Sequence, residues 1–137
     1  MNPISIVGAG PGAIDLITIR ALDRVKSADA IFWTDSLVPK SIVDLASKDC
    51  EKIKTSSLTL EEIIPMMIDR NKEGKKVVRL HDGDPCLYGA ISEQIYALNK
   101  ANIETEVIPG VSAYQATAAS LQSELTLPGE IQTIILT

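Results

Sequence analysis

Five times along this chain, a short strand-like run, apolar in four cases and weaker in the one near 52–54, is followed by glycine or polar residues and then by a stretch with helical spacing. Each run has the length and composition of a buried strand, and strand–helix–strand units with short links form right-handed crossovers in a parallel sheet. The sequence therefore predicts one α/β domain, a doubly wound, parallel five-stranded sheet with helices on both faces. The expected strands are 4–7, 30–33, a weaker one near 52–54, 77–80 and 104–108.

Capping residues indicate where the helices between these strands begin. Thr18 precedes apolar residues at helical spacing, and Thr59 with Glu62 forms a capping box before a helix that Gly74 ends. Pro65 removes one backbone donor inside that helix, which predicts a kink or a distorted first turn. Further helices are expected from about Lys40 to Ala46, along the face of Leu87, Ile91, Ile95 and Leu98, and over 111–121, where alanines permit close packing.

The last residues form a further apolar, strand-like segment. Residues 131–137 follow Pro128 and Gly129. Two interpretations are open, either an edge strand of the same sheet or a strand that leads into a second domain outside this chain. On the second interpretation, residues 1–128 are the domain that carries the cleft, and 129–137 lead toward the absent domain.

The composition limits the kinds of partner that the protein can bind and indicates its cellular location. The net charge is −5, and the basic residues form no stripe with aromatic residues between them, which argues against a nucleic-acid surface. No apolar run reaches the roughly 18 residues of a membrane span, so we expect a soluble protein without a membrane contact. Cys50 and Cys86 are isolated and His81 is the single histidine, which predicts no disulfide framework, no metal site and a cytoplasmic location.

The first glycine-rich turn has several interpretations. Residues 8–13 match the dinucleotide-binding pattern G-x-G-x-x-[GA], and Asp35 follows at about the distance of a ribose-binding acid. That pattern requires a helix that begins within the glycines, whereas the first helix cap here is Thr18. A tight structural turn and a turn that lets a substrate approach the backbone are therefore the stronger interpretations.

Polar residues and glycines also follow the later strands. Residues 82–84 come after the fourth strand and 110–113 after the fifth. Two carboxylates at 82–84 are costly unless they meet water or a ligand, although an Asx–Pro turn there and an N-cap at Ser112 are alternative roles. Because the carboxyl ends of parallel strands share one edge, the sequence predicts a small-molecule cleft there. For His81, a hydrogen-bonding role at the strand end is favoured over catalysis.

Four ordered motifs carry a resemblance to a known family: 7–12, 33–38, 83–89 and 108–112. Together they resemble the tetrapyrrole (corrin/porphyrin) methyltransferases over essentially the whole chain. The stretches 35–38, 81–85, 124–128 and 132–137 are most similar to the branch that methylates carbon 11 of precorrin-4, or of its cobalt form, in cobalamin biosynthesis. A member acting on uroporphyrinogen or another precorrin is the nearest alternative. Family members are about twice as long, so only their first domain is matched.

The resemblance implies an S-adenosylmethionine-dependent C-methyltransferase that acts on a precorrin-type tetrapyrrole in a cleft between two α/β domains, usually as a homodimer. It implies Asp35 as the proton acceptor and Lys54 as the proton donor, with Pro11 shaping the loop on the substrate side. The implied cofactor-binding set is Pro11, Asp82, Gly83, Asp84, Leu87, Ser112 and Ala113.

The chemistry of methyl transfer makes a further prediction for Asp35. A carboxylate that faces an apolar cleft has a raised pKa, which suits removal of the proton released when a ring carbon is alkylated. An Asx turn is the alternative role. Because the substrate carries many carboxylates, Arg20, Lys40 or Lys54 is expected near the cleft. Two other classes stay open, a dinucleotide-dependent oxidoreductase and a binding module without activity of its own.

Overall fold

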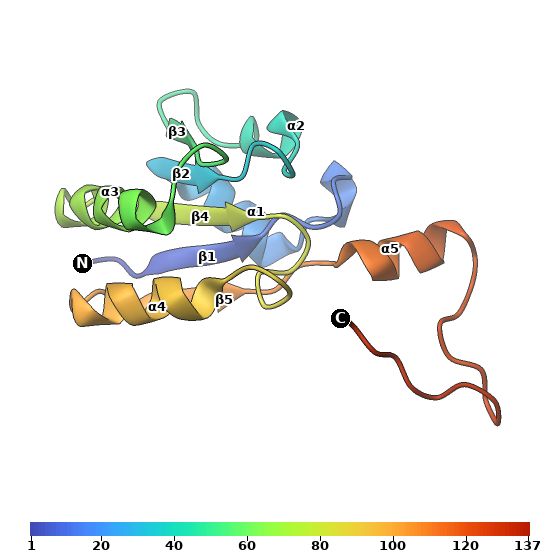
Figure 1. The fold of residues 1–137 in the computed structure, drawn as a ribbon. Coiled ribbons are helices and arrows are strands. Elements are labelled where there is room, and N and C mark those ends of the chain that lie inside the picture. The colour runs from blue at the N-terminus through green and yellow to red at the C-terminus, as the bar shows by residue number, and fades with distance from the viewer.

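A parallel five-stranded sheet forms the centre of the protein in the computed structural model, which describes residues 1–137 (Figure 1). Every pair of neighbouring strands is parallel, and the strand order is β3-β2-β4-β1-β5. The predicted strands and the doubly wound layout are confirmed. The strands are β1 (Ile4–Gly8), β2 (Ala30–Trp33), β3 (Glu51–Lys54), β4 (Val77–His81) and β5 (Thr105–Ile108).

Helices cover both faces of the sheet and bury two separate cores. α1 (Ile19–Ser27) and α2 (Lys40–Val43) pack on one face, and α3 (Leu60–Lys72) and α4 (Ile91–Lys100) pack on the other. Successive side chains of a strand point to opposite faces of the sheet. On β2, Ile31 therefore belongs to the core under α1 and α2, and Phe32 to the core under α3 and α4. The three central strands, β1, β2 and β4, are buried along their whole length, which is typical of sheets covered by helices on both faces.

The predicted bounds of α1 and α3 agree with the structure, whereas α2 ends at Val43, before the predicted end at Ala46. Thr18 Oγ1 accepts a hydrogen bond from Ala21 N at 3.2 Å, and the capping box of Thr59 and Glu62 is present. α3 continues through Pro65, which lies inside the helix. The prediction that Leu87 belongs to the next helix is wrong: α4 begins at Ile91, because Tyr88 and Ala90 have left-handed backbone angles (φ 57° and 50°) that interrupt a helix.

The C-terminal part leaves the sheet. α5 (Ala113–Ser120) is shorter than predicted and buries none of its residues, so the expected close packing of its alanines does not occur within this chain. Residues 131–137 do not join the sheet, and Ile131 forms only an isolated bridge with Leu127. The edge-strand prediction is wrong, because α5 carries the chain beyond the carboxyl edge and the last residues do not return beside a strand (Figure 1).

None of the helices combines the length and the apolar composition that crossing a bilayer requires.

Candidate functional site

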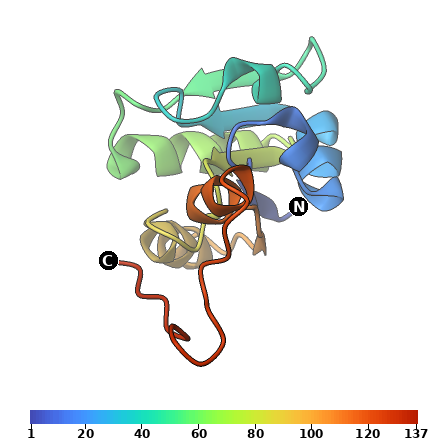
Figure 2. The same ribbon diagram turned by 90° about the vertical axis from the view of Figure 1, so that its right-hand side faces the viewer.

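The loops that the sequence analysis singled out all leave one edge of the sheet. Because the five strands are parallel, the segments after β1, β2, β4 and β5 start at the carboxyl edge, which faces the viewer in Figure 2. Asp35, Asp84 and Ser112 therefore lie at the same edge, as predicted. α5 projects from this edge toward the viewer, and the chain that follows α5 lies below the loops in this view.

The backbone is closely packed where β1, β4 and β5 end. A Cβ atom at Gly8 would lie 2.6 Å from the Gly83 oxygen and 2.8 Å from the Gly110 nitrogen, and one at Gly110 would overlap the same oxygen. Gly10 and Gly83 form an antiparallel bridge, in which Gly83 N donates to Gly10 O at 2.8 Å. These glycines bring three loops into direct backbone contact, which larger residues would prevent.

The Asp84 carboxylate joins two of these loops. One oxygen accepts a hydrogen bond from Cys86 N at 2.8 Å, as in an Asx turn, and the other accepts one from Gly110 N at 3.0 Å. Ser112 caps α5 in a capping box with Gln115. The turn and cap roles considered for these residues are confirmed, and they fix the backbone around the hollow between the loops.

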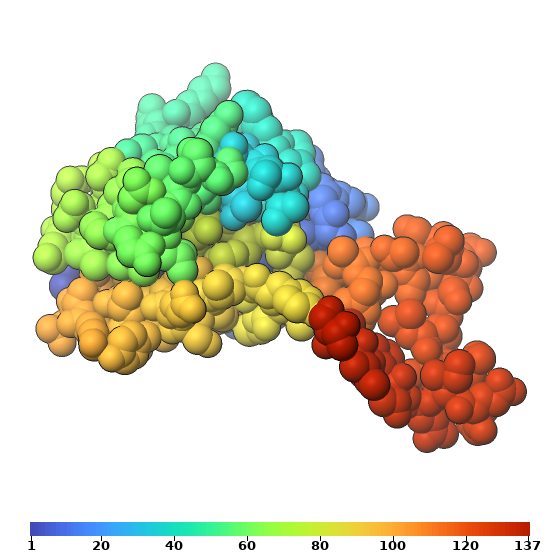
Figure 3. Space-filling model, viewed as in Figure 1, coloured from blue at the N-terminus to red at the C-terminus, as the bar shows by residue number.

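A cleft of about 420 Å³ opens between the loop after β4 and the start of α5. This volume falls within the range of small-molecule sites, roughly 300–1,000 Å³. Tyr88 and Tyr114 add aromatic surface, and the C-terminal residues 135–137 form another wall, seen in dark red against the yellow loop in Figure 3. Six of the seven residues predicted to hold the cofactor line the cleft: Asp82, Gly83, Asp84, Leu87, Ser112 and Ala113.

Pro11, the seventh predicted residue, lies outside this cleft. It lines a neighbouring hollow together with Ala13 and Leu16, and the two hollows share only Ala113. The structure therefore places Pro11 on the other side of the start of α5, apart from the remaining six residues.

Asp35, in the turn after β2, and Lys54, at the end of β3, lie at the carboxyl edge and do not line the cleft. Trp33 pairs with Lys54 in the β2–β3 ladder, and Ser56 N donates to Asp35 Oδ1 at 3.0 Å. Hydrogen bonds from Ser56, with a smaller contribution from the charge of Lys54, lower the pKa of Asp35. The prediction of a raised pKa is wrong, because this half-buried carboxylate is held by hydrogen-bond donors instead of facing an apolar wall.

A group of buried polar residues lies beside the cleft, and of these only His81 was considered from the sequence. Arg79 and His81 lie on β4 and Gln94 on α4, and none of them is more than 6% exposed. Burial, with the charge of Arg79, lowers the pKa of His81 to about 4, so this histidine is neutral at physiological pH. The signal that could have revealed the group is the charge of Arg79 inside an otherwise apolar strand.

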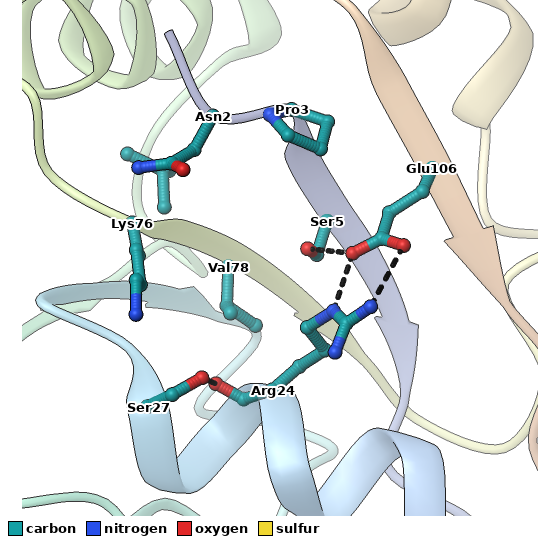
Figure 4. A pocket seen from close by; sticks show the side chains of 9 residues that line it. Asn2, Pro3, Ser5, Arg24, Ser27, Lys76, Val78 and Glu106 are labelled. Atoms are coloured by element: carbon teal, nitrogen blue, oxygen red, sulfur yellow. Dashed lines mark hydrogen bonds and ion pairs between the residues drawn. The ribbon is translucent and has the colours of Figure 1, made fainter.

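Another hollow, of about 250 Å³, lies at the amino edge of the sheet, away from every predicted site residue (Figure 4). Glu106 there accepts hydrogen bonds from Arg24 Nε and Ser5 Oγ, both at 2.5 Å. The Arg24 hydrogen bond is the main cause of the lowered pKa of Glu106. Because this carboxylate is already paired, we assign the functional site to the carboxyl edge.

Comparison with known proteins decides the family. Residues 3–137, nearly the whole chain, match the profile of the tetrapyrrole (corrin/porphyrin) methylases. The chain belongs to the tetrapyrrole methylase family. This family member is 48% identical over 134 residues to a cobalt-precorrin-4 C(11)-methyltransferase of Methanocaldococcus jannaschii and 45% identical over 132 residues to that of Priestia megaterium. The alignments cover 98% and 96% of this chain but 52% and 51% of those proteins.

Solved structures of tetrapyrrole methylases share the fold. A cobalt precorrin-4 methyltransferase superposes with a TM-score of 0.94 at 43% identity, over 97% of this chain and 56% of that one. Uroporphyrin-III C-methyltransferase from Thermus thermophilus, in complex with S-adenosylhomocysteine, superposes with a TM-score of 0.76 at 30% identity, over 93% and 51%. The chain thus spans about half the length of the relatives it matches.

The turn after β1 separates this tetrapyrrole methylase from dinucleotide-binding domains. After the glycines, the chain forms a 3₁₀ helix at Ile14–Leu16, and α1 begins only at Ile19. The prediction that the first helix begins late is confirmed. The turn therefore lacks the helix amino end that would face a pyrophosphate in a dinucleotide site.

Proposed function

We propose that this chain is the N-terminal half of an S-adenosylmethionine-dependent C-methyltransferase that acts on carbon 11 of precorrin-4, or of cobalt-precorrin-4, in cobalamin biosynthesis. The observation that carries the proposal is the cleft at the carboxyl edge, where six residues predicted to hold the cofactor meet. The two relatives described above are named for this reaction, and the Thermus methyltransferase structure holds S-adenosylhomocysteine.

The cleft fits such a cofactor in its chemistry as well as its size. The Asp84 carboxylate is engaged by two backbone donors, whereas Asp82 is exposed, which leaves the Asp82 carboxylate to accept hydrogen bonds from a ligand. Leu87 and Tyr114 provide the apolar and aromatic surface that a purine ring needs. Gly83 adds backbone that a ligand can approach closely.

When bound, the cofactor supplies a methyl group on a positively charged sulfur, an electrophile that needs little covalent help. The main task of the chain is then to hold the acceptor carbon in line with that methyl group. Asp35 is ionised at neutral pH because its pKa is lowered, so it is able to accept the proton that the alkylated carbon releases. Lys54 lies beside it at the end of β3 and is the proposed proton donor.

The exposed apolar surface of the C-terminal part supports a second half. α5 buries no residue in this chain, and seven large apolar side chains after it are exposed, as is typical of a surface that another part covers. We infer that the missing half covers this surface and completes the cleft. The homodimer and the cytoplasmic location are proposed from the family resemblance and from the two free cysteines. The exposed residues are Leu121, Leu125, Leu127, Ile131, Ile134, Ile135 and Leu136.

Calorimetry tests the cofactor assignment directly. We expect the chain to bind S-adenosylhomocysteine and not NAD or FAD. Leu87→Glu, which puts a charge in the cleft wall, should weaken binding at least about tenfold, and Leu125→Glu, at an exposed position outside the cleft, should leave it unchanged. Binding of NAD, or equal effects of the two substitutions, would contradict the assignment.

Turnover requires the missing half, so the assay uses residues 1–137 fused to the remaining part of the Priestia megaterium relative. With precorrin-4 or its cobalt form, we expect S-adenosylhomocysteine to be released. Asp35→Asn should lower kcat about 10²-fold and leave the affinity for S-adenosylhomocysteine nearly unchanged, while the exposed Asp49→Asn is the matched control. Equal turnover of Asp35→Asn and wild type would refute the base role.

A further inference from the structure

A second recess adjoins the cleft at the carboxyl edge. It has a volume of about 220 Å³ and lies between the ends of β2 and β4 and the start of α4. Asp82, Leu87 and Tyr88 line both spaces, so the recess and the cleft are separated only by the loop after β4. Its inner wall contains Arg79 and Gln94.

Arg79 is a buried cation without an anionic partner. Its side chain is 5% exposed, and its hydrogen bonds come from Nη1, which donates to Phe32 O at 3.3 Å and to Thr34 Oγ1 at 3.4 Å. Nε is buried and has no hydrogen-bond partner, and no carboxylate oxygen lies within the 4.0 Å of an ion pair. Burial lowers the pKa of Arg79 to about 10, so the guanidinium remains charged at neutral pH.

The residues around Arg79 do not neutralise it. His81 is itself neutral, and Gln94 Nε2 donates to the carbonyls of Gly89 and Ala90 at 3.3 and 3.4 Å. The one carboxylate that lines the recess belongs to Asp82, which is exposed at its rim. A buried guanidinium of this kind is costly unless a ligand supplies the anion, and a carboxylate matches its paired donors.

We propose that this recess binds a carboxylate side chain of the methyl acceptor and that Arg79 is its partner, an inference that rests on the proposed function. The position of the recess favours a carboxylate of the methyl acceptor over the amino-acid carboxylate of the methyl donor. The six predicted cofactor residues line the larger cleft, whereas the recess is lined by Thr34 and Leu37, which flank Asp35, the proposed proton acceptor. A carboxylate anchored there holds the ring between the donor and Asp35.

The loop between the two spaces has the backbone of a functional segment. Tyr88 and Ala90, neither of them glycine, both adopt positive φ angles, which cost energy and cluster where ligands are clamped. The Tyr88 side chain is 77% exposed, and it lines the cleft on one side and the recess on the other. The loop is thus in place to contact both reactants.

The first test detects the carboxylate at Arg79 itself. Sodium propionate is titrated into the ¹⁵N-labelled chain, with propionamide as the neutral isostere, and the Arg79 Nε–Hε signal is assigned by its loss in Arg79→Met. We expect this signal to shift with propionate only, because a carboxylate at the guanidinium changes the environment of the whole group, Nε included. Arg70, which already pairs with Glu51 at 2.7 Å, is the internal control and should not shift. No shift at Arg79, or equal shifts with both compounds, would overturn the proposal.

The second test distinguishes a carboxylate of the tetrapyrrole from the carboxylate of the cofactor. It also distinguishes a binding role of Arg79 from a purely structural one. Arg79→Met should weaken binding of uroporphyrin III about 10- to 100-fold and leave S-adenosylhomocysteine affinity within about twofold, with Arg79→Lys in between. Its Tm should not fall, because an uncompensated buried charge is removed. A lower Tm with unchanged uroporphyrin affinity, or an equal loss of S-adenosylhomocysteine affinity, contradicts the assignment. Failure of the wild type to bind S-adenosylhomocysteine, by contrast, counts against the proposed function.

Discussion

Gly8→Ala tests whether the site depends on direct contact between three loops. Gly8 has no positive φ, so alanine meets no backbone strain there, and the only cost is steric. The added Cβ lies 2.6 Å from the Gly83 oxygen and 2.8 Å from the Gly110 nitrogen. Both are backbone atoms and cannot rotate away, so the loops after β4 and β5 must move apart.

The expected loss lies at the upper end of overpacking costs, about 3 kcal/mol. For a chain of 137 residues, about 3–4 °C of Tm per kcal/mol gives a fall of about 10 °C. Gly74→Ala is the matched control: its φ is +84° and nothing lies within 4 Å of the added Cβ, so it pays backbone strain alone, about 1 kcal/mol.

Differential scanning calorimetry of both variants, followed by titration with S-adenosylhomocysteine, measures the effect. Gly8→Ala should lower the Tm about three times as much as Gly74→Ala and should also weaken ligand binding. Equal Tm values for the two variants would refute the packing argument. A destabilised Gly8→Ala that binds with wild-type affinity would show that the loops carry no ligand.

Three further outcomes are expected. Asp84→Ala leaves the N–H groups of Cys86 and Gly110 without their acceptor and should lower the free energy of unfolding by about 2 kcal/mol in urea titrations, with Asp84→Asn losing less. His81 is neutral when folded, with its pKa lowered from 6.5 to about 4, so stability should fall as pH drops from about 6.5 to 4, by at most about 3 kcal/mol, and His81→Asn should flatten this decline. Glu106 has a lowered pKa, so its stabilisation is present above pH 4.5 and is lost below it as pH falls through the folded value; Glu106→Gln should remove that part of the acid transition while costing under about 1 kcal/mol at pH 7.

The three central strands of the sheet, β1, β2 and β4, were predictable because they are buried on both faces. Such strands appear in the sequence as short apolar runs, and 30–33 is predicted with the bounds that β2 has. The start of α4 was not predictable in the same way, since Tyr88 and Ala90 adopt left-handed angles that side chains disfavour and that no local pattern signals. For the C-terminal residues, only the edge-strand alternative is wrong, because an apolar segment indicates burial without indicating what buries it; that they lead into a second domain stays a prediction.

The site was predictable where it follows directly from topology. Residues placed after parallel strands meet at one edge, which is why six of seven predicted cofactor residues share a cleft. The electrostatics depend on contacts between distant segments. The pKa of Asp35 is set mainly by Ser56, 21 residues further along the chain, and Arg79 lacks an anionic partner because of how β2, β4 and α4 pack.

For residues such as Gly83, Asp84 and Ser112, a structural turn or cap and a ligand-binding role were first treated as alternatives. In the structure, the same residues hold the loop backbone in place and line the cleft, so the two roles occur together. The Gly83 carbonyl accepts from Gly10 N at 3.2 Å while the same residue lines the cleft, and Asp84 fixes Gly110 while it lines the cleft as well. A ligand that contacts backbone groups binds well only when those groups are held in place, so the residues that fix the loops also support binding. Substitutions here should therefore change stability and affinity together. Arg79→Met, which removes a buried charge without an anionic partner and two long hydrogen bonds, should lower affinity without lowering Tm.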